Sequence, residues 1–153
     1  MIIVSACLAG INCTYRGDSN EKERITSLVS GGDIMLVCPE QLGGLTTPRE
    51  AVEIAAGNGA TVLEGISRVK CASGVDVTDQ FVRGAKEVLK IAKLCGAEFA
   101  ILKSRSPSCG KGIIHDGSFS GGLTEGNGVT AEILIQNGIT VFTEEEYISR
   151  LSD

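Results

Sequence analysis

Short apolar runs alternate along the chain with longer stretches in which apolar residues recur every three or four positions. Runs bounded by turn residues predict buried strands, and we place four of them at residues 1–6, Ile34–Val37, Phe99–Leu102 and Ile139–Phe142. The helical spacing predicts helices at Asn20–Val29, Thr78–Leu94 and Val129–Gln136, and the capping box Thr143–Glu146 opens a further one. Strands that alternate with helices are typical of a parallel sheet.

The middle of the chain has a different pattern. We expect short strands of a meander or flap at Ala51–Ile54, Thr61–Leu63 and Ser67–Lys70. Asp116 and Gly117 predict a hairpin turn between Ile113–His115 and Ser118–Ser120. Thr78 is the expected N-cap of the longest predicted helix.

These elements indicate one α/β domain over residues 1–153, which is long enough to bury a core of its own. Cys7 and Cys38 are 31 positions apart, a spacing that fits one strand–helix–strand unit. We therefore predict a three-layer αβα domain with a mostly parallel, Rossmann-like sheet and a small β flap or hairpin.

Composition and net charge restrict the partners and the cellular compartment that we expect for this protein. The net charge of −5 argues against a nucleic-acid polymer as partner, because such proteins carry a basic footprint. The apolar start lacks the basic residues of a signal peptide, and no run reaches the ~18 apolar residues of a membrane span. We therefore expect a cytoplasmic protein with a small-molecule partner. In that compartment its six cysteines are expected as thiols or metal ligands rather than disulfides.

Three of the cysteines follow apolar runs directly or lie in the loop just beyond one. Cys7 and Cys38 close the first two predicted strands, and Cys109 lies shortly after Phe99–Leu102. In open α/β sheets, ligands bind beyond the carboxyl ends of the strands. If these strands are parallel neighbours, three thiols converge there, as they do in a metal or iron–sulfur site.

The remaining cysteines differ in what they indicate. Cys71 and Cys95 are expected as small core residues. Cys13 is a fourth candidate that could ligate, react as a thiol or simply pack. Four thiolates would close a metal or cluster site, whereas three would leave one coordination position for water or substrate. His115, the only histidine, is expected on a hairpin rather than on a metal.

Four segments together resemble the thiouracil desulfidase family. They run in order over nearly the whole chain: Ser5–Gly10 with Cys13-Thr14-Tyr15, Cys38–Arg49, Gly74–Ala85 and Lys103–Gly110. The resemblance implies a [4Fe–4S] cluster on Cys7, Cys38 and Cys109, with zinc or an empty site in aerobic preparations. It also implies removal of sulfur from thiouracil, thiouridine or its monophosphate without net redox change. Glu40 and Ser104 match the catalytic positions of that family.

Two departures from the family pattern stand near these residues. The family usually carries Arg-Tyr-Asp-Gly after the second cysteine, where this chain has Thr14-Tyr15-Arg16-Gly17. This replaces a carboxylate with the guanidinium of Arg16 and bears on substrate preference. Thr46 stands where the family usually has proline, which bears on loop rigidity.

The resemblance suggests a division of chemical roles. The open iron would bind the thiocarbonyl sulfur, Glu40 would activate a water, and Ser104 would hydrogen-bond the substrate or the developing tetrahedral centre. Without the resemblance, Glu40 is equally well a solvated or helix-capping carboxylate, and Ser104 a turn residue. The alternatives are a non-catalytic zinc-binding or thiol redox-sensing module, and a sulfur carrier that uses Cys13 or Cys109.

A nucleotide substrate would also need an anion site. Gly126–Gly128 directly precedes a predicted helix, where backbone N–H groups receive anions, although a plain helix entry fits the same pattern. The basic side chains that could add charge are Arg49, Lys103, Arg105 and Lys111.

Overall fold

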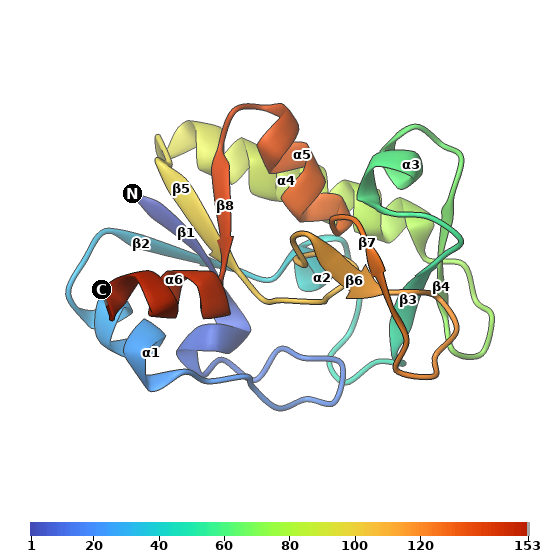
Figure 1. The fold of residues 1–153 in the computed structure, drawn as a ribbon, viewed down its shortest axis with the longest axis horizontal. Helices are drawn as coiled ribbons and strands as arrows, with labels where there is room; N and C mark the ends of the chain where they lie inside the picture. Colours follow the sequence, from blue (N-terminus) through green and yellow to red (C-terminus); the bar gives the residue numbers. More distant parts are fainter. Residues whose placement is uncertain (153) are drawn as a thin grey trace.

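The computed structural model describes residues 1–152, in which a four-stranded parallel sheet forms the centre of the molecule (Figure 1). Its strands are β1 (Ile2–Ser5), β2 (Ile34–Val37), β5 (Phe99–Leu102) and β8 (Thr140–Thr143), in the spatial order β2-β1-β5-β8. Ile2 pairs with Ile34 on one side and with Phe99 on the other. The carboxyl ends of all four strands therefore meet at one edge of the sheet.

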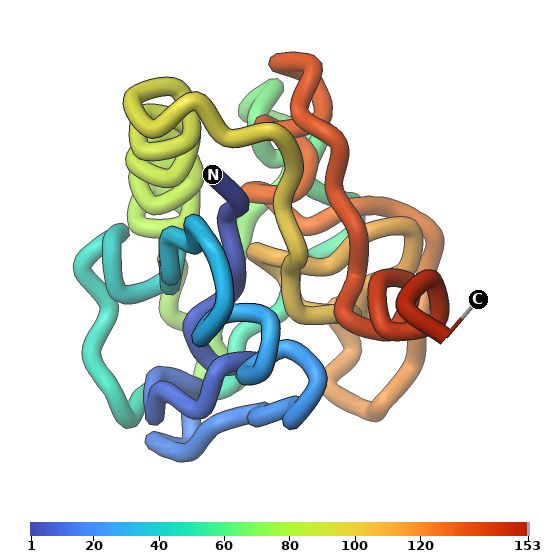
Figure 2. The backbone as a smooth tube through the Cα atoms, turned by 90° about the vertical axis from the view of Figure 1, so that its left-hand side faces the viewer, coloured from blue at the N-terminus to red at the C-terminus, as the bar shows by residue number. Residues whose placement is uncertain are grey.

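Helices cover both faces of this sheet, as Figures 1 and 2 show from two directions. One face carries α4 (Thr78–Leu94), α5 (Val129–Gln136) and the short α2 (Pro39–Leu42). The other carries α1 (Glu23–Ser30) and α6 (Glu144–Leu151). No helix within residues 1–152 combines the length and apolarity needed to cross a membrane. The predicted three-layer αβα architecture is confirmed.

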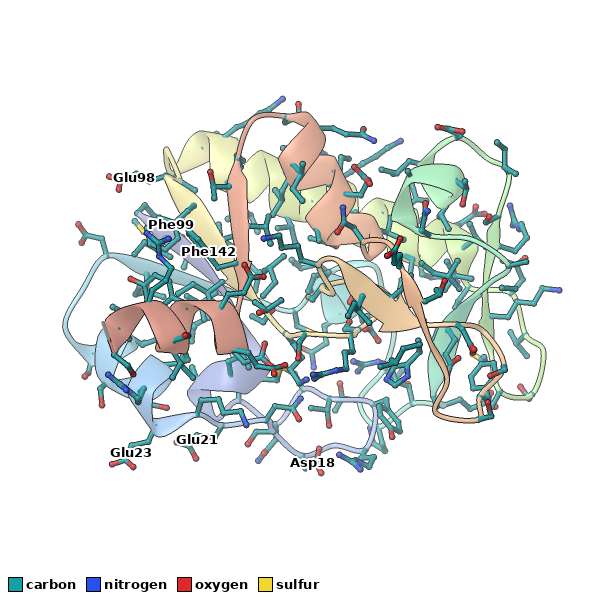
Figure 3. All side chains as sticks on the ribbon, viewed as in Figure 1. Asp18, Glu21, Glu23, Glu98, Phe99 and Phe142 are labelled. Atoms are coloured by element: carbon teal, nitrogen blue, oxygen red, sulfur yellow. The ribbon has the colours of Figure 1, made fainter. Side chains whose placement is uncertain are left out.

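Two hydrophobic cores hold the layers together. The larger one packs the sheet against α4 and α5, with Phe81 and Val88 among its fully buried side chains. The smaller one packs Val4 and Ile101 against Ile25 of α1. At its margin Phe99 and Phe142, both labelled in Figure 3, meet edge to face, and both contact Tyr147 of α6.

Two small antiparallel hairpins lie beyond the carboxyl edge of the sheet. β3 (Val52–Ala55) pairs with β4 (Arg68–Cys71), and α3 (Gly59–Leu63) connects them. β6 (Ile113–His115) pairs with β7 (Leu123–Glu125). These hairpins correspond to the predicted flap and hairpin, although their details differ from the expectation.

Three local expectations are wrong. Thr61–Leu63 is helical, because the Asn58 side chain accepts from the Thr61 N–H and the Thr61 hydroxyl caps in return. Thr78 lies inside α4, where its hydroxyl accepts from the Val69 N–H instead of capping the helix. The partner strand of β6 is β7 and not Ser118–Ser120, because that segment belongs to the connecting loop.

The short helix α2 approaches α4 through two glycines. A Cβ atom on Gly43 would lie 2.0 Å from the Gln80 carbonyl oxygen, and one on Gly84 would lie 1.9 Å from the Pro39 carbonyl oxygen. Any side chain at either position would therefore separate the two helices. This contact fixes the position of α2, which begins directly after Cys38 and carries Glu40.

Candidate active site

A cavity of about 490 Å³ opens where the hairpins face the carboxyl edge of the sheet. It is lined by all five residues that the sequence analysis singled out for a site: Cys7, Glu40, Cys38, Ser104 and Cys109. Cys13, the fourth candidate thiol, lines it as well. Residues from distant parts of the chain are thus brought to one place.

Each of the three strand-end thiols is positioned by its own element. Cys7 lies in the 3-10 helix η1 (Ala6–Ala9), which follows β1 without a gap. Cys38 is the N-cap of α2 and follows β2. Cys109 is buried beyond β5, where the Ser5 hydroxyl lies 3.4 Å from its sulfur and donates to it. Ser5 also accepts from the Lys103 N–H, which joins the ends of β1 and β5.

The loop that carries Cys109 is fastened by the start of α5. The Val129 N–H donates to the Pro107 carbonyl, and the Thr130 and Ala131 N–H groups both donate to the Ser108 carbonyl. Because these N–H groups are already used, the predicted anion site before this helix is wrong. The helix entry instead holds a cavity loop in place.

Cys13 interacts with two of the other thiols. Hydrogen bonding with the Cys13 thiol lowers the pKa of Cys38 to about 6 and is also the main cause that lowers the pKa of Cys7. The same contacts raise the pKa of Cys13, which keeps this thiol protonated. Burial raises the pKa of Cys109 to about 12. The environment therefore favours thiolates at Cys7 and Cys38, the form that binds metals.

The thiols in the cavity lining are a donor set that iron–sulfur clusters use. Within residues 1–152, no three His, Cys, Asp or Glu side chains are grouped closely enough to hold one metal ion. In a four-iron cluster each thiolate binds a different iron, so the thiols surround a volume instead of meeting at one point. Soft thiolates around a cavity are the ligands that iron–sulfur clusters use, and the residues present fit such a group.

Glu40 is held on both sides at the edge of the cavity. Its Oε1 atom accepts from Arg49 Nε at 3.0 Å, and its Oε2 atom accepts from Ser108 Oγ at 2.9 Å. The side chains of Glu40 and Arg49 are 14% and 8% exposed. Arg49 also donates to the Cys13 carbonyl, so one guanidinium orients both the carboxylate and the Cys13 loop.

Ser104 is buried in a network of charged groups. Its hydroxyl donates to Glu144 Oε1 at 2.7 Å, and its N–H donates to Glu144 Oε2 at 2.8 Å. Lys103 Nζ and Arg105 Nη1 both donate to the Ser104 oxygen, at 3.2 and 3.1 Å. One anion, Glu144, and two cations, Lys103 and Arg105, thus fix the orientation of this hydroxyl.

Several cavity residues were missed by the sequence analysis. Tyr15, Phe119 and His115 line the cavity, and His115 Nδ1 is buried with no hydrogen-bond partner among residues 1–152. Glu53, also in the lining, accepts from the Phe119 N–H and so fastens the loop between β6 and β7. Tyr15 stands in the Cys13-Thr14-Tyr15 segment of the family resemblance but was given no role there, and no motif marks His115, Phe119 or Glu53, because the hairpin partners had to be known first.

The basic residues divide into two groups. Arg49, Lys103 and Arg105 line the cavity, and so does Arg16, the residue that departs from the family pattern. Lys111 is not part of the lining and forms an ion pair with Glu146 at 2.9 Å. Each of the four cations in the lining is paired with a carboxylate, so the cavity presents charges of both signs.

An α/β domain whose strand ends surround a cavity belongs to the class of proteins with a ligand site at the carboxyl edge of a parallel sheet, and here thiols line that cavity. Comparison with known proteins is more specific. The family model described as 2-thiouracil desulfurase matches residues 2–146, and the chain belongs to this family. The resemblance noted in the sequence is thereby confirmed.

Two relatives cover nearly the whole chain. The uncharacterized protein YbbK of Bacillus subtilis (strain 168) is 47% identical over 146 residues, which are 95% of this chain and 97% of YbbK. The solved structure of the [4Fe–4S]-dependent thiouracil desulfidase TudS (DUF523Vcz) is 37% identical with a TM-score of 0.82. That match covers 99% of this chain and 98% of the solved one.

Proposed function

We propose that the protein is a [4Fe–4S]-dependent desulfidase that converts thiolated uracil compounds to their oxo forms and releases sulfide. The observation that carries this proposal is the convergence of Cys7, Cys38, Cys109, Glu40 and Ser104 on one cavity. Family membership and the solved desulfidase of the same fold support it.

Cys7, Cys38 and Cys109 are the residues that would hold the cluster. Three protein ligands leave one iron with an open position, and when bound the cluster supplies a Lewis acid that makes the thiocarbonyl carbon more electrophilic. The lowered pKa values of Cys7 and Cys38 support ligand roles for these two. Cys13 would remain a protonated thiol beside them, since its pKa is raised.

Glu40 would act as the general base. Water replaces sulfur in the overall reaction, R₂C=S + H₂O → R₂C=O + H₂S, so a proton must leave the water as its oxygen attacks the carbon. A carboxylate on the cavity wall can accept that proton. Arg49 and Ser108 keep both carboxylate oxygens of Glu40 oriented during this step.

Ser104 would hydrogen-bond the substrate, as its position in the cavity lining permits. The neighbouring cations Lys103 and Arg105 can stabilise negative charge that develops on the attacked centre. Their charge, together with that of Arg16 at the cavity, would also favour an anionic substrate such as thiouridine monophosphate over the neutral base or nucleoside.

Sulfide release from anaerobically reconstituted protein tests the proposal. Thiouracil, thiouridine and thiouridine monophosphate are incubated with the protein, and both sulfide and the oxo product are quantified. Equal amounts of sulfide and oxo product are expected, at a rate proportional to protein concentration. Iron-loaded protein that leaves all three compounds unchanged would refute the proposal. The Cys38→Ala variant, treated identically, controls for sulfide from unbound iron.

One observation favours an alternative, a thiol redox-sensing module. Cys13 contacts both Cys7 and Cys38, an arrangement in which thiols can exchange disulfide partners. A redox module would be colourless after anaerobic reconstitution and would release no sulfide from thiouracil. It would instead show reversible disulfide formation between these cysteines by mass spectrometry.

A further inference from the structure

The hydrogen bonds of Ser104 determine what it can offer to a ligand. A hydroxyl has one hydrogen to donate and two lone pairs to accept with. Ser104 donates this hydrogen to Glu144 Oε1, and its two lone pairs accept hydrogen bonds from Lys103 Nζ and Arg105 Nη1. All three positions on the oxygen are therefore used, and a ligand that contacts it must replace one of these partners.

We propose that Glu144 is a positioning residue that makes Ser104 a hydrogen-bond acceptor toward the substrate. The cavity would then select thiocarbonyl compounds that carry a ring N–H beside the thiocarbonyl carbon. This inference rests on the proposed function and deepens it by specifying the substrate class.

Of the three partners of the Ser104 oxygen, Glu144 is the one that a ligand is least able to replace. Its side chain is 3% exposed, and Ser104 donates to both of its oxygens from the N–H and the hydroxyl. Lys103 Nζ lies 3.5 Å from the same carboxylate. Glu144 is also the first residue of α6, where the helix dipole favours a negative charge.

The Arg105 contact is the one that a ligand can replace. The Arg105 side chain is 44% exposed, and its guanidinium already has a partner in Glu145, 2.8 Å from Nη1. Arg105 therefore keeps a charged neighbour when it leaves Ser104. Because Arg105 donates to the Ser104 oxygen, whatever takes its place must also be a donor.

Uracil-type thiones provide that donor. In 2-thiouridine and 4-thiouridine, whose N1 carries the ribose, the N3–H group is bonded directly to the thiocarbonyl carbon and is the only ring N–H. In 2-thiocytidine the same ring nitrogen has no hydrogen and is an acceptor. If that ring nitrogen faces the Ser104 oxygen, it finds no donor, because the hydroxyl hydrogen is bonded to Glu144. Both atoms then lack a hydrogen-bond partner, which costs free energy in a buried site.

A glutamine at position 144 would reverse this polarity. The Ser104 N–H requires an acceptor, so the amide oxygen of the glutamine would face it. The amide NH₂ group would then face the Ser104 hydroxyl and donate to it. The hydroxyl hydrogen would have to point elsewhere, and the cavity is the direction that remains for a donor to the ligand.

The experiment compares kcat/KM for 2-thiouridine and 2-thiocytidine in iron-loaded protein, because the ribose on N1 leaves N3 as the only ring nitrogen that can carry a hydrogen. The unsubstituted protein should prefer 2-thiouridine by about tenfold or more, since a site built to hydrogen-bond one polar group rejects the analogue that lacks it. Glu144→Gln should lower this preference by about tenfold or more, with the loss confined to 2-thiouridine. Glu146→Gln is the matched control, because it removes a carboxylate from the same turn of α6. Glu146 pairs with Lys111, which lies outside the cavity lining.

A readout without turnover uses the reaction product. Calorimetric titration with uridine and cytidine should show the same preference for the ring N–H in the unsubstituted protein. Ser104→Ala, which deletes the acceptor, should lose the preference, and Glu144→Gln should have no further effect on that background. If circular dichroism shows that Glu144→Gln does not fold, the Ser104→Ala variant alone tests the inference.

An unchanged preference in folded Glu144→Gln, or an undiminished preference in Ser104→Ala, would overturn the inference. Failure of the proposed function would look different. In that case the unsubstituted, iron-loaded protein would release sulfide from neither 2-thiouridine nor 2-thiocytidine, whatever its affinities for uridine and cytidine.

Discussion

Glu40 is surrounded by groups that orient it but leave its carboxylate on the cavity wall. Arg49 and Ser108 each donate to a different oxygen; Arg49 is 9 positions from Glu40 in the sequence, and Ser108 is 68 positions away. A glutamine can keep one of these hydrogen bonds but cannot accept a proton. The substitution therefore separates a chemical role for this residue from a structural one.

Glu40→Gln should slow turnover of thiouracil by ~10²–10⁴, the usual contribution of an acid–base group, while the iron content stays unchanged. Single-turnover desulfidation and iron analysis on the same sample measure both quantities. Glu64→Gln, at the exposed end of α3, is a control that should retain full activity. A Glu40→Gln protein as active as the unsubstituted one would remove Glu40 from the chemistry.

The cysteines allow a similar separation between site and core. Cys38→Ala should abolish both the brown colour and desulfidation, because it removes a ligand at the end of β2. Cys95→Ala should leave both intact, since this side chain packs at the margin of the larger core. Absorbance spectra and iron content after anaerobic reconstitution distinguish the two. A Cys38→Ala protein that retained its iron would show that this thiol is not a ligand.

At the residue scale, the sequence predicted more of the site's position than of its surroundings. Cys7, Cys38 and Cys109 were found because cysteines at strand ends converge in a parallel sheet. Glu40 and Ser104 were singled out by the family resemblance. Glu144 was expected only within a capping box, because its contact with Ser104 joins residues 40 positions apart in the sequence.

Among the elements, α2 connects the fold most directly to the site. It begins after Cys38, carries Glu40, and touches α4 through the backbone at Gly43 and Gly84. The position of the Glu40 carboxylate thus depends on a helix contact outside the cavity. The absence of side chains at these two glycines allows that contact.

Gly84→Ala should therefore be destabilising even though alanine is the better helix former. Overpacking of this kind costs about 1–3 kcal/mol, and the displaced α2 should also lower desulfidation. Urea denaturation and turnover measure the two effects. Gly31→Ala is the matched control, because the nearest atom to its added Cβ would be 3.8 Å away. Equal stability of the two variants would mean that the α2–α4 contact tolerates a methyl group.

Element prediction failed where local hydrogen bonds outweighed the apolar pattern. Thr61–Leu63 has the composition of a strand, but the capping box of Asn58 and Thr61 begins a helix there. The signal was present in the sequence as an asparagine three positions before a threonine. The strand that pairs with β6 could not be predicted, because its seven-residue connection leaves the register undefined.

At the scale of the whole molecule, the proposed cluster would add a further connection between segments that already meet through the sheet and through the hydrogen bond of Ser108 to Glu40. Its ligands follow β1, β2 and β5, which are three adjacent strands. A group that binds the folded protein and not the unfolded chain stabilises the fold. The alternating pattern was sufficient to predict this architecture, since parallel strands order their carboxyl ends without any knowledge of side-chain contacts.

Removing the iron should consequently lower the melting temperature by at least about 5 °C, from binding linkage of roughly 2–3 kcal/mol. Differential scanning calorimetry of reconstituted and chelator-treated protein under anaerobic conditions measures the difference. The Cys38→Ala variant should show no such response to iron. Identical melting temperatures for iron-loaded and iron-free protein would indicate that the metal binds outside the strand ends.

The central claim is that three cysteines hold a four-iron cluster and leave one iron open to the substrate. Mössbauer spectroscopy of protein reconstituted with ⁵⁷Fe, recorded with and without 2-thiouracil, tests it most directly. We predict that one iron in four differs from the others and that its signal alone shifts when 2-thiouracil is added. Four equivalent irons that do not respond to 2-thiouracil would contradict the account.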